Sequence, residues 1–259
     1  MTPLSVRGVS RSFGGLHALA NVSFELQSGE RRAFIGTNGA GKTTLFNVIN
    51  GQLRATSGQI WLFGEEATRM PAHARAARGL ARTFQINSLF PELTVLDNMA
   101  LAVQAVDRAR YSFYKRRDSY AHILDQARAH LARWRLLELH ATLVKELSYG
   151  VQRQLEIVLA LAGRPRLVLL DEPMAGLSAS ETRLAIEVIL SLDRSITVLM
   201  IEHDLEAAFE IADRITAMDQ GRIVADGTPD ELRAANTLER LFMGAYTGAG
   251  ESRDRQGSA

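Results

Sequence analysis

A glycine-rich segment has the residue types and the spacing that bind phosphate groups. Residues 36–43 read GTNGAGKT and lie between a short apolar run and an expected helix. Glycines let backbone N–H groups surround phosphate oxygens, while Lys42 would reach the β- and γ-phosphates and the Thr43 hydroxyl would bind Mg²⁺. The alternative, a glycine-rich surface turn, is less favoured in this context. We expect this phosphate loop to bind a nucleoside triphosphate through Gly36, Asn38, Gly39, Ala40, Gly41, Lys42, Thr43 and Thr44.

Two adjacent carboxylates follow an apolar run later in the chain. Residues 167–172 read LVLLDE, the pattern of a strand buried on both faces. Ligands of open α/β sheets bind at the carboxyl ends of such strands. Asp171 would hold Mg²⁺ through a water molecule, and Glu172 would act as the general base or position the attacking water. A solvated acidic turn is the alternative, which the phosphate loop makes less favoured.

Three other segments carry side chains that could join such a site. His203 follows the next buried run, and its strand end is expected beside that of Glu172, although a lone histidine is more often structural. Gln85 ends a helical stretch in RTFQ. Residues 147–154 read LSYGVQRQ and precede a helix, whose free N–H groups and positive dipole end suit an anion. The chain therefore offers a second anion site, distant in sequence from the first.

Alternating strands and helices are expected to position these residues. The runs RRAFIG, LVLLDEP and ITVLMIEHD are typical of parallel strands, and amphipathic segments between them predict helices. Residues 4–30 alternate as antiparallel strands do, and residues 214–227 predict a hairpin that turns at Gln220 and Gly221. The predicted fold class is α/β with a mostly parallel sheet.

Helices rich in Ala, Leu and Arg are expected within this α/β pattern, at residues 70–84, 93–106 and 118–139. Arg75, Arg78 and Arg82 are spaced three and four apart, so they would form one solvated helix face. The run KRR at residues 115–117 predicts a solvated loop, with contact to anionic headgroups as the minor alternative.

Composition narrows the class of protein. The 259 residues carry a formal net charge of +1, which gives no electrostatic reason to expect a nucleic acid partner. The chain has no cysteine, so disulfides and thiolate metal sites are excluded. The N-terminal residues contain no apolar signal core, and no apolar run approaches the ~20 residues that cross a bilayer. We expect a cytoplasmic protein that meets a membrane only through a partner.

The order of these motifs resembles that of the ATPase subunits of ABC transporters. GTNGAGKT, RTFQ, LSYGVQRQ, LVLLDEP, AGLS and IEH follow one another in that family's order, and the resemblance covers residues 4–246. It implies a P-loop NTPase core with an N-terminal antiparallel β subdomain and an inserted α-helical subdomain at about residues 87–162. Residues 1–246 would form a single ATPase domain, and the tail at 247–259, which is poor in apolar residues, would be disordered.

The resemblance also implies roles for individual residues. Two subunits would pack head to tail, so that Ser148, Tyr149 and Gly150 (the signature turn) contact the ATP held by the partner's phosphate loop. Phe13 would stack on adenine, with a core residue of the hairpin as the alternative. Gln85 would bind Mg²⁺ and the attacking water, next to a docking surface for membrane subunits. The apolar anchors of that surface, within residues 86–98, would be Leu89 and Phe90.

Some positions depart from the usual family pattern. Thr37 replaces a proline, the signature reads LSYGV rather than LSGGQ, and Ser178 stands where an aspartate is usual. These departures concern the contacts between paired subunits. They bear also on the activity of an isolated subunit, but they do not change the family resemblance.

Within the family, the chain looks like the ATPases of branched-chain amino acid importers. The similarity lies in residues 79–102, in LSYGVQRQLEI, and in the closing segments GTPDEL and LFMGAY. It implies a second ATPase subunit, two membrane permeases, a solute-binding protein reached indirectly, and a place at the cytoplasmic face of the membrane. Importers of urea or amides and exporters remain alternatives. An ABC ATPase without a transport role is disfavoured, because the chain has one phosphate loop and no sustained heptads.

Overall fold

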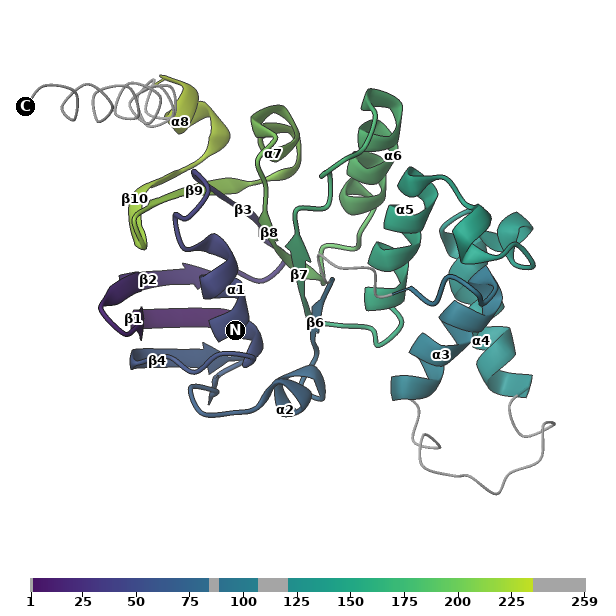
Figure 1. The fold of residues 1–259 in the computed structure, drawn as a ribbon, viewed down its shortest axis with the longest axis horizontal. Helices are drawn as coiled ribbons and strands as arrows, with labels where there is room; N and C mark the ends of the chain where they lie inside the picture. The colour runs from purple at the N-terminus through teal and green to yellow at the C-terminus, as the bar shows by residue number, and fades with distance from the viewer. Residues whose placement is uncertain (1, 84–88, 107–120, 235–259) are drawn as a thin grey trace, which may run out of the picture.

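The computed structural model describes residues 2–83, 89–106 and 121–234. Two β-sheets and a group of helices are arranged side by side, with the antiparallel sheet at one end and the helices α3 (Val95–Val106) and α4 (Ala121–Arg133) at the other (Figure 1). Among the described residues, no helix is both long enough and apolar enough to span a bilayer.

The first sheet is antiparallel and has the strand order β2-β1-β4-β5. Its strands are β1 (Leu4–Phe13), β2 (Leu16–Leu26), β4 (Ser57–Leu62) and β5 (Glu65–Glu66). Val22, Phe24 and Leu26 of β2 and Ile60 and Leu62 of β4 are buried at every second position, as the period of two predicts. The predicted antiparallel N-terminal strands are therefore confirmed.

The second sheet has the order β10-β9-β3-β8-β7-β6. Four strands are parallel along one continuous stretch of it: β3 (Arg31–Ile35), β8 (Thr197–Ile201), β7 (Leu167–Asp171) and β6 (Leu80–Arg82). Strand β9 (Arg214–Asp219) runs parallel to β3 and forms the predicted hairpin with β10 (Arg222–Gly227). Every residue of β3, β7 and β8 is buried, which explains their continuous apolar runs.

Two hydrophobic clusters hold these layers together. One packs α1 (Lys42–Asn50) between the antiparallel sheet and the parallel strands, around Phe34 and Phe46. The other joins the parallel sheet to the remaining helices, whose bounds are α3 (Val95–Val106), α4 (Ala121–Arg133), α5 (Tyr149–Ala160), α6 (Ala179–Leu190), α7 (Leu205–Ile211) and α8 (Pro229–Ala234). Short 3₁₀ turns at Leu137–Leu139 and Val144–Glu146 lead into α5.

Residues 70–84 do not form the single helix that their sequence predicts. Helix α2 ends early (Ala72–Ala76), Gly79 turns the chain with φ 101°, and residues 80–82 pair with β7 as strand β6. The predicted solvated arginine face is therefore wrong. Arg75 is 1% exposed and donates hydrogen bonds to five backbone carbonyls, two of them in the last turn of α1. Of the three arginines on that predicted face, Arg78 alone is exposed, with 39% of its side chain accessible.

The two predicted apolar docking anchors differ in exposure. Leu89 is buried and packs in the hydrophobic cluster that includes α3, so it is not a surface anchor. Phe90 is 56% exposed and remains available for a partner. Gln85, the KRR run and the tail at 247–259 lie outside the described residues.

Candidate functional site

The phosphate loop connects β3 to α1, as predicted. Gly41 precedes the helix with φ 100°, and a Cβ atom there would lie 2.5 Å from the carbonyl oxygen of Ala18. A Cβ on Gly36 would lie 2.2 Å from the carbonyl oxygen of Met218, so the loop passes too close to neighbouring backbone for side chains. These close approaches explain why the loop needs glycine at both positions.

Lys42 lies at the start of α1 and is 5% exposed. Its Nζ donates to the carbonyl oxygens of Gly36 (2.6 Å) and Thr37 (3.0 Å), within its own loop. Burial lowers the pKa of the ammonium group, while the nearby carboxylates of Glu172 and Asp171 act in the opposite direction. The lysine is therefore held close to both carboxylates that the sequence singles out.

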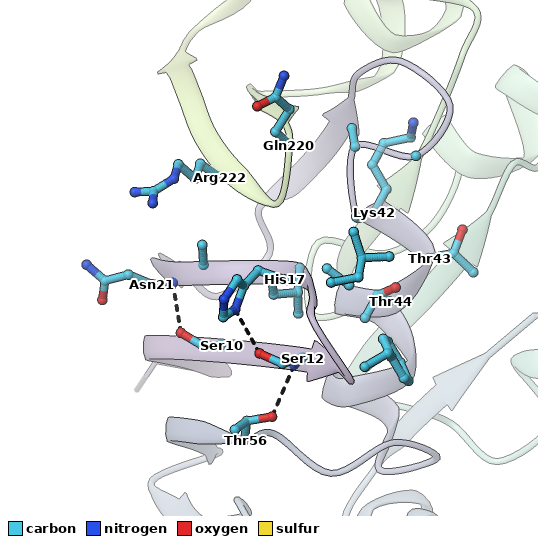
Figure 2. A pocket seen from close by; sticks show the side chains of 18 of the residues that line it. Ser10, Ser12, His17, Asn21, Lys42, Thr43, Thr44, Thr56, Gln220 and Arg222 are labelled. Carbon is cyan, nitrogen blue, oxygen red and sulfur yellow. Dashed lines mark hydrogen bonds between the residues drawn. The ribbon is translucent and has the colours of Figure 1, made fainter.

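A cavity of about 1200 Å³ opens between the phosphate loop and the β1–β2 hairpin (Figure 2). Lys42, Thr43 and Thr44 face it from α1, and His17 faces it from the hairpin. Its other lining residues include Asn38, Gly39, Ala40, Gly41, Glu172, His203, Gln220 and Arg222. The cavity therefore brings together the loop, Glu172 and His203, which lie far apart in the sequence.

Phe13 stands at the end of β1 and lines the same cavity. Its side chain is 42% exposed, and the guanidinium of Arg11 lies 4.5 Å from the ring centre. This exposure excludes the alternative in which Phe13 is a core residue of the hairpin. One face of an aromatic ring is thus available at the mouth of the cavity, where a planar base could stack.

Glu172 and His203 meet at the ends of β7 and β8. The distance from Glu172 Oε1 to His203 Nε2 is 2.6 Å, and the glutamate side chain is the more buried of the two. Glu172 has φ 49°, a left-handed conformation that non-glycine residues rarely adopt. The backbone turn at the end of β7 thus directs this carboxylate toward the cavity.

Asp171 is completely buried beside Glu172. Its Oδ2 accepts a hydrogen bond of 2.7 Å from Arg82, which also donates to Asn47 Oδ1 on α1 at 2.6 Å. The other oxygen, Oδ1, is buried and has no hydrogen-bond partner among the described residues. An unsatisfied carboxylate oxygen of this kind suits a divalent cation or a cation-bound water, because Mg²⁺ prefers oxygen ligands.

The signature turn lies at the start of α5 and does not line the cavity. Ser148 caps the helix by accepting a hydrogen bond from the Val151 N–H. Gly150 N–H donates to Glu181 Oε1 at 2.9 Å, and hydrogen bonds from Ser178, Gly150 and Ser148 lower the pKa of Glu181. The signature turn therefore lies apart from the cavity, its Gly150 N–H is bonded to a carboxylate of the same chain, and Tyr149 is half exposed.

Sequence reasoning missed three buried charged residues around the two carboxylates. Arg82 was assigned to a solvated helix, and Arg153 and Glu202 were given no role. Glu202 Oε1 accepts from the Met174 N–H at 3.0 Å, and burial raises its pKa to about 7. Arg153 and Glu156 stand three residues apart and are both buried on α5. That spacing of opposite charges indicates an ion pair along the helix, but it does not reveal that the pair is buried.

These features define a nucleotide-binding P-loop protein with an α/β core, as the sequence predicts. A family profile described as ABC transporter matches residues 19–175. The chain is 39% identical over 250 residues to the high-affinity branched-chain amino acid transport ATP-binding protein LivG of Salmonella typhimurium, covering 93% of this chain and 97% of LivG. It is 36% identical over 248 residues to the corresponding protein BraF of Pseudomonas aeruginosa, with the same coverage.

The fold of a solved structure leads to the same family. An ATP-binding cassette of an ABC transporter in its ADP conformation superposes with a TM-score of 0.82 at 27% identity, covering 94% of this chain and 99% of that one. The chain therefore belongs to the ABC transporter family and is one of its nucleotide-binding ATPase subunits.

Proposed function

We propose that this chain is the ATP-hydrolysing subunit of an importer for branched-chain or related amino acids. The observation that carries the catalytic part is the meeting of Glu172 and His203 at 2.6 Å in the cavity that the phosphate loop also lines. The solute class rests on the similarity to LivG and BraF, which cover nearly the whole chain. We assign no solute-binding surface to the described residues, because the solute would pass through other subunits.

In the proposed function, ATP occupies the cavity between the loop and the hairpin. Phe13 stacks on adenine, and Lys42 exchanges the carbonyls of Gly36 and Thr37 for the phosphates. The buried position of Lys42 strengthens this contact, since a charge-assisted hydrogen bond gains from exclusion of water. The remaining phosphate contacts come from backbone N–H groups of residues 36–44.

Mg²⁺ would be held by Thr43, Gln85 and Asp171. When bound, Mg²⁺ neutralises charge on the phosphates. Asp171 does not line the cavity, and its unpartnered Oδ1 is suited to act through a water molecule. Glu172 would orient the attacking water and accept its proton, while His203 holds the glutamate by the contact to Oε1 and faces the γ-phosphate.

The signature turn would act on the ATP of a second subunit. Its separation from the cavity of its own chain supports a head-to-tail pair in which each turn closes the partner's site. ATP would then hold the pair closed, and hydrolysis would reopen it. The helical segment between β6 and β7 carries the exposed Phe90 and is the part that we propose contacts two membrane permeases at the cytoplasmic face.

The catalytic assignment is tested by Glu172→Gln. We expect ATP hydrolysis to fall by roughly 10²–10⁴-fold, the usual effect of removing a positioned base, while binding of a fluorescent ATP analogue is retained. The matched control is Glu187→Gln on the exposed side of α6, which should leave both measurements unchanged. Normal turnover in Glu172→Gln would remove this residue from the role.

The transport assignment is tested with the same variant in its native host. Tagged Glu172→Gln chain, trapped with ATP and gently solubilised, should co-purify with two polytopic membrane proteins and a solute-binding protein. That binding protein can then be titrated with leucine, isoleucine and valine. A complex without membrane proteins would contradict the transport role and leave the ATPase chemistry intact.

A further inference from the structure

Arg153 links the helix that begins at the signature turn to the strand end that carries the carboxylates. It lies on α5, is 6% exposed, and extends toward the end of β7. Its guanidinium donates to the backbone carbonyls of Asp171 (2.7 Å), Glu172 (2.6 Å) and Pro173 (3.2 Å). One side chain therefore bonds three consecutive carbonyls, with Glu172 at the centre.

The charge of Arg153 is balanced on its own helix. Glu156 Oε2 accepts from Nη1 at 2.6 Å, and both side chains are less than a tenth exposed. A buried ion pair of this kind is often replaceable by apolar residues without loss of stability, because desolvation offsets the Coulomb attraction. Stability of α5 therefore does not by itself explain why a charged pair stands here, and the three carbonyl contacts suggest geometry as the reason.

The backbone that Arg153 holds is a strained one. Glu172 has a left-handed φ of 49°, which is sparsely populated for a residue with a side chain. Its N–H donates to the carbonyl of Ile201 on β8, and its carbonyl also accepts from the Ala175 N–H. Such a conformation persists only where the surroundings overdetermine it, and Arg153 supplies contacts on both sides of the peptide.

We propose that Arg153 is a positioning residue for ATP hydrolysis, which keeps the Glu172 backbone in the conformation that brings its carboxylate to His203 and the cavity. This inference rests on the proposed catalytic role of Glu172. It also links the signature turn to the proposed base: α5 begins at the turn that would meet the partner's ATP and carries, one turn later, the side chain that holds Glu172 of the same chain.

The test removes the hydrogen bonds from Arg153 to the three carbonyls and leaves no unpaired charge in the interior. In Arg153→Met/Glu156→Leu, we expect kcat for ATP to fall at least tenfold with KM and ATP-analogue binding changed less than threefold, because the phosphate loop is untouched. The matched control is Asp125→Leu/Arg128→Met, which removes an exposed pair of the same spacing on α4 and should leave kcat unchanged. An unchanged kcat in the first variant overturns the proposal.

Action through Glu172 is tested by a double-mutant cycle. In the Glu172→Gln background, the same pair of substitutions should change residual single-turnover hydrolysis less than twofold, since the base that Arg153 positions is already lost. Equal losses in both backgrounds would mean a general structural role and overturn this proposal alone. Full activity of Glu172→Gln itself would overturn both this proposal and the catalytic role of Glu172.

A second variant keeps the proposal testable if the double substitution prevents folding. Arg153→Lys keeps a buried cation beside Glu156, but an ammonium cannot reproduce the planar fork of donors to three carbonyls. We expect an intermediate kcat, lowered about threefold or more, with an unchanged KM. A lysine variant with wild-type kcat would refute the positioning role.

Discussion

The ion pair between Arg82 and Asp171 gives a test of how the buried carboxylate is maintained. The two side chains are 6% and 1% exposed, and their closest N–O distance is 2.7 Å. Arg82→Met keeps most of the volume of the stem but removes the cation. The variant leaves a buried carboxylate with one fewer partner, and such unpaired charges destabilise strongly.

The size of the effect can be bounded from the contacts. Removing one partner of a buried pair typically costs about 3–5 kcal/mol. Lys42 remains close enough to interact electrostatically with Asp171, so we expect the lower end, about 3 kcal/mol. For a chain of this size that corresponds to a fall in Tm of roughly 6–12 °C.

The assay is thermal and urea unfolding of the nucleotide-free protein without Mg²⁺. Arg78→Met is the matched control, because Arg78 makes an ion pair of the same 2.7 Å with Glu65, but both of these side chains are exposed. That variant should lose only about 0–1 kcal/mol. The double variant Arg82→Met/Asp171→Asn should recover part of the loss, because the stranded charge is gone.

Two results would refute this reasoning. If Arg82→Met loses no more stability than Arg78→Met, burial does not increase the contribution of the Arg82–Asp171 pair to the free energy of unfolding. If the double variant is no more stable than Arg82→Met, the loss arises from packing or from the bond to Asn47 rather than from an unpaired charge.

Two further predictions concern buried charged residues that do not line the cavity. Arg75→Met should lower the free energy of unfolding by roughly 1–3 kcal/mol in urea titrations, because the carbonyls of Ile49 and Met70 lose their donor; wild-type stability would mean that other donors replace it. Burial raises the pKa of Glu202 from 4.5 to about 7, so the folded state binds this proton more tightly than the unfolded state. The resulting contribution to the free energy of unfolding is fully present below pH 4.5 and is lost as the pH rises through 7. The stability of Glu202→Gln relative to wild type should therefore rise between pH 4.5 and 8, by about 3 kcal/mol at most for a pKa raised from 4.5 to about 7; a difference that does not change with pH would contradict the raised pKa.

The parts of the site that depend on the residue pattern of a single contiguous segment could be predicted from the sequence. The phosphate loop was predictable because strand, glycines and helix are contiguous, and β7 and β8 because each is buried along its whole length. The juxtaposition of Glu172 and His203 followed from parallel strands ending at one edge. These conclusions need only the order of elements along the chain.

The misassigned region shows where local pattern fails. The richness of residues 70–84 in Ala, Leu and Arg predicts a helix there, yet residues 80–82 form a three-residue strand paired with β7. So short a strand has too few residues to show a period of two, and its conformation is set by its neighbour. The burial of Arg75 has a similar origin, because two of its five acceptors come from residues distant in the sequence, at the end of α1.

The positions of charged side chains suggest which part of the site changes when nucleotide binds. Arg82 and His203 contact the two carboxylates at the end of β7, and Arg153 bonds the backbone carbonyls of the same two residues, each from a different segment. Charges fixed before reaction need no reorganisation during it, which is how preorganised sites lower barriers. Lys42 differs, because it bonds carbonyls of its own loop that phosphate oxygens can replace. In the proposed function, binding therefore rearranges Lys42, while hydrolysis depends on contacts that already exist, so substitutions of Arg153 should separate turnover from affinity.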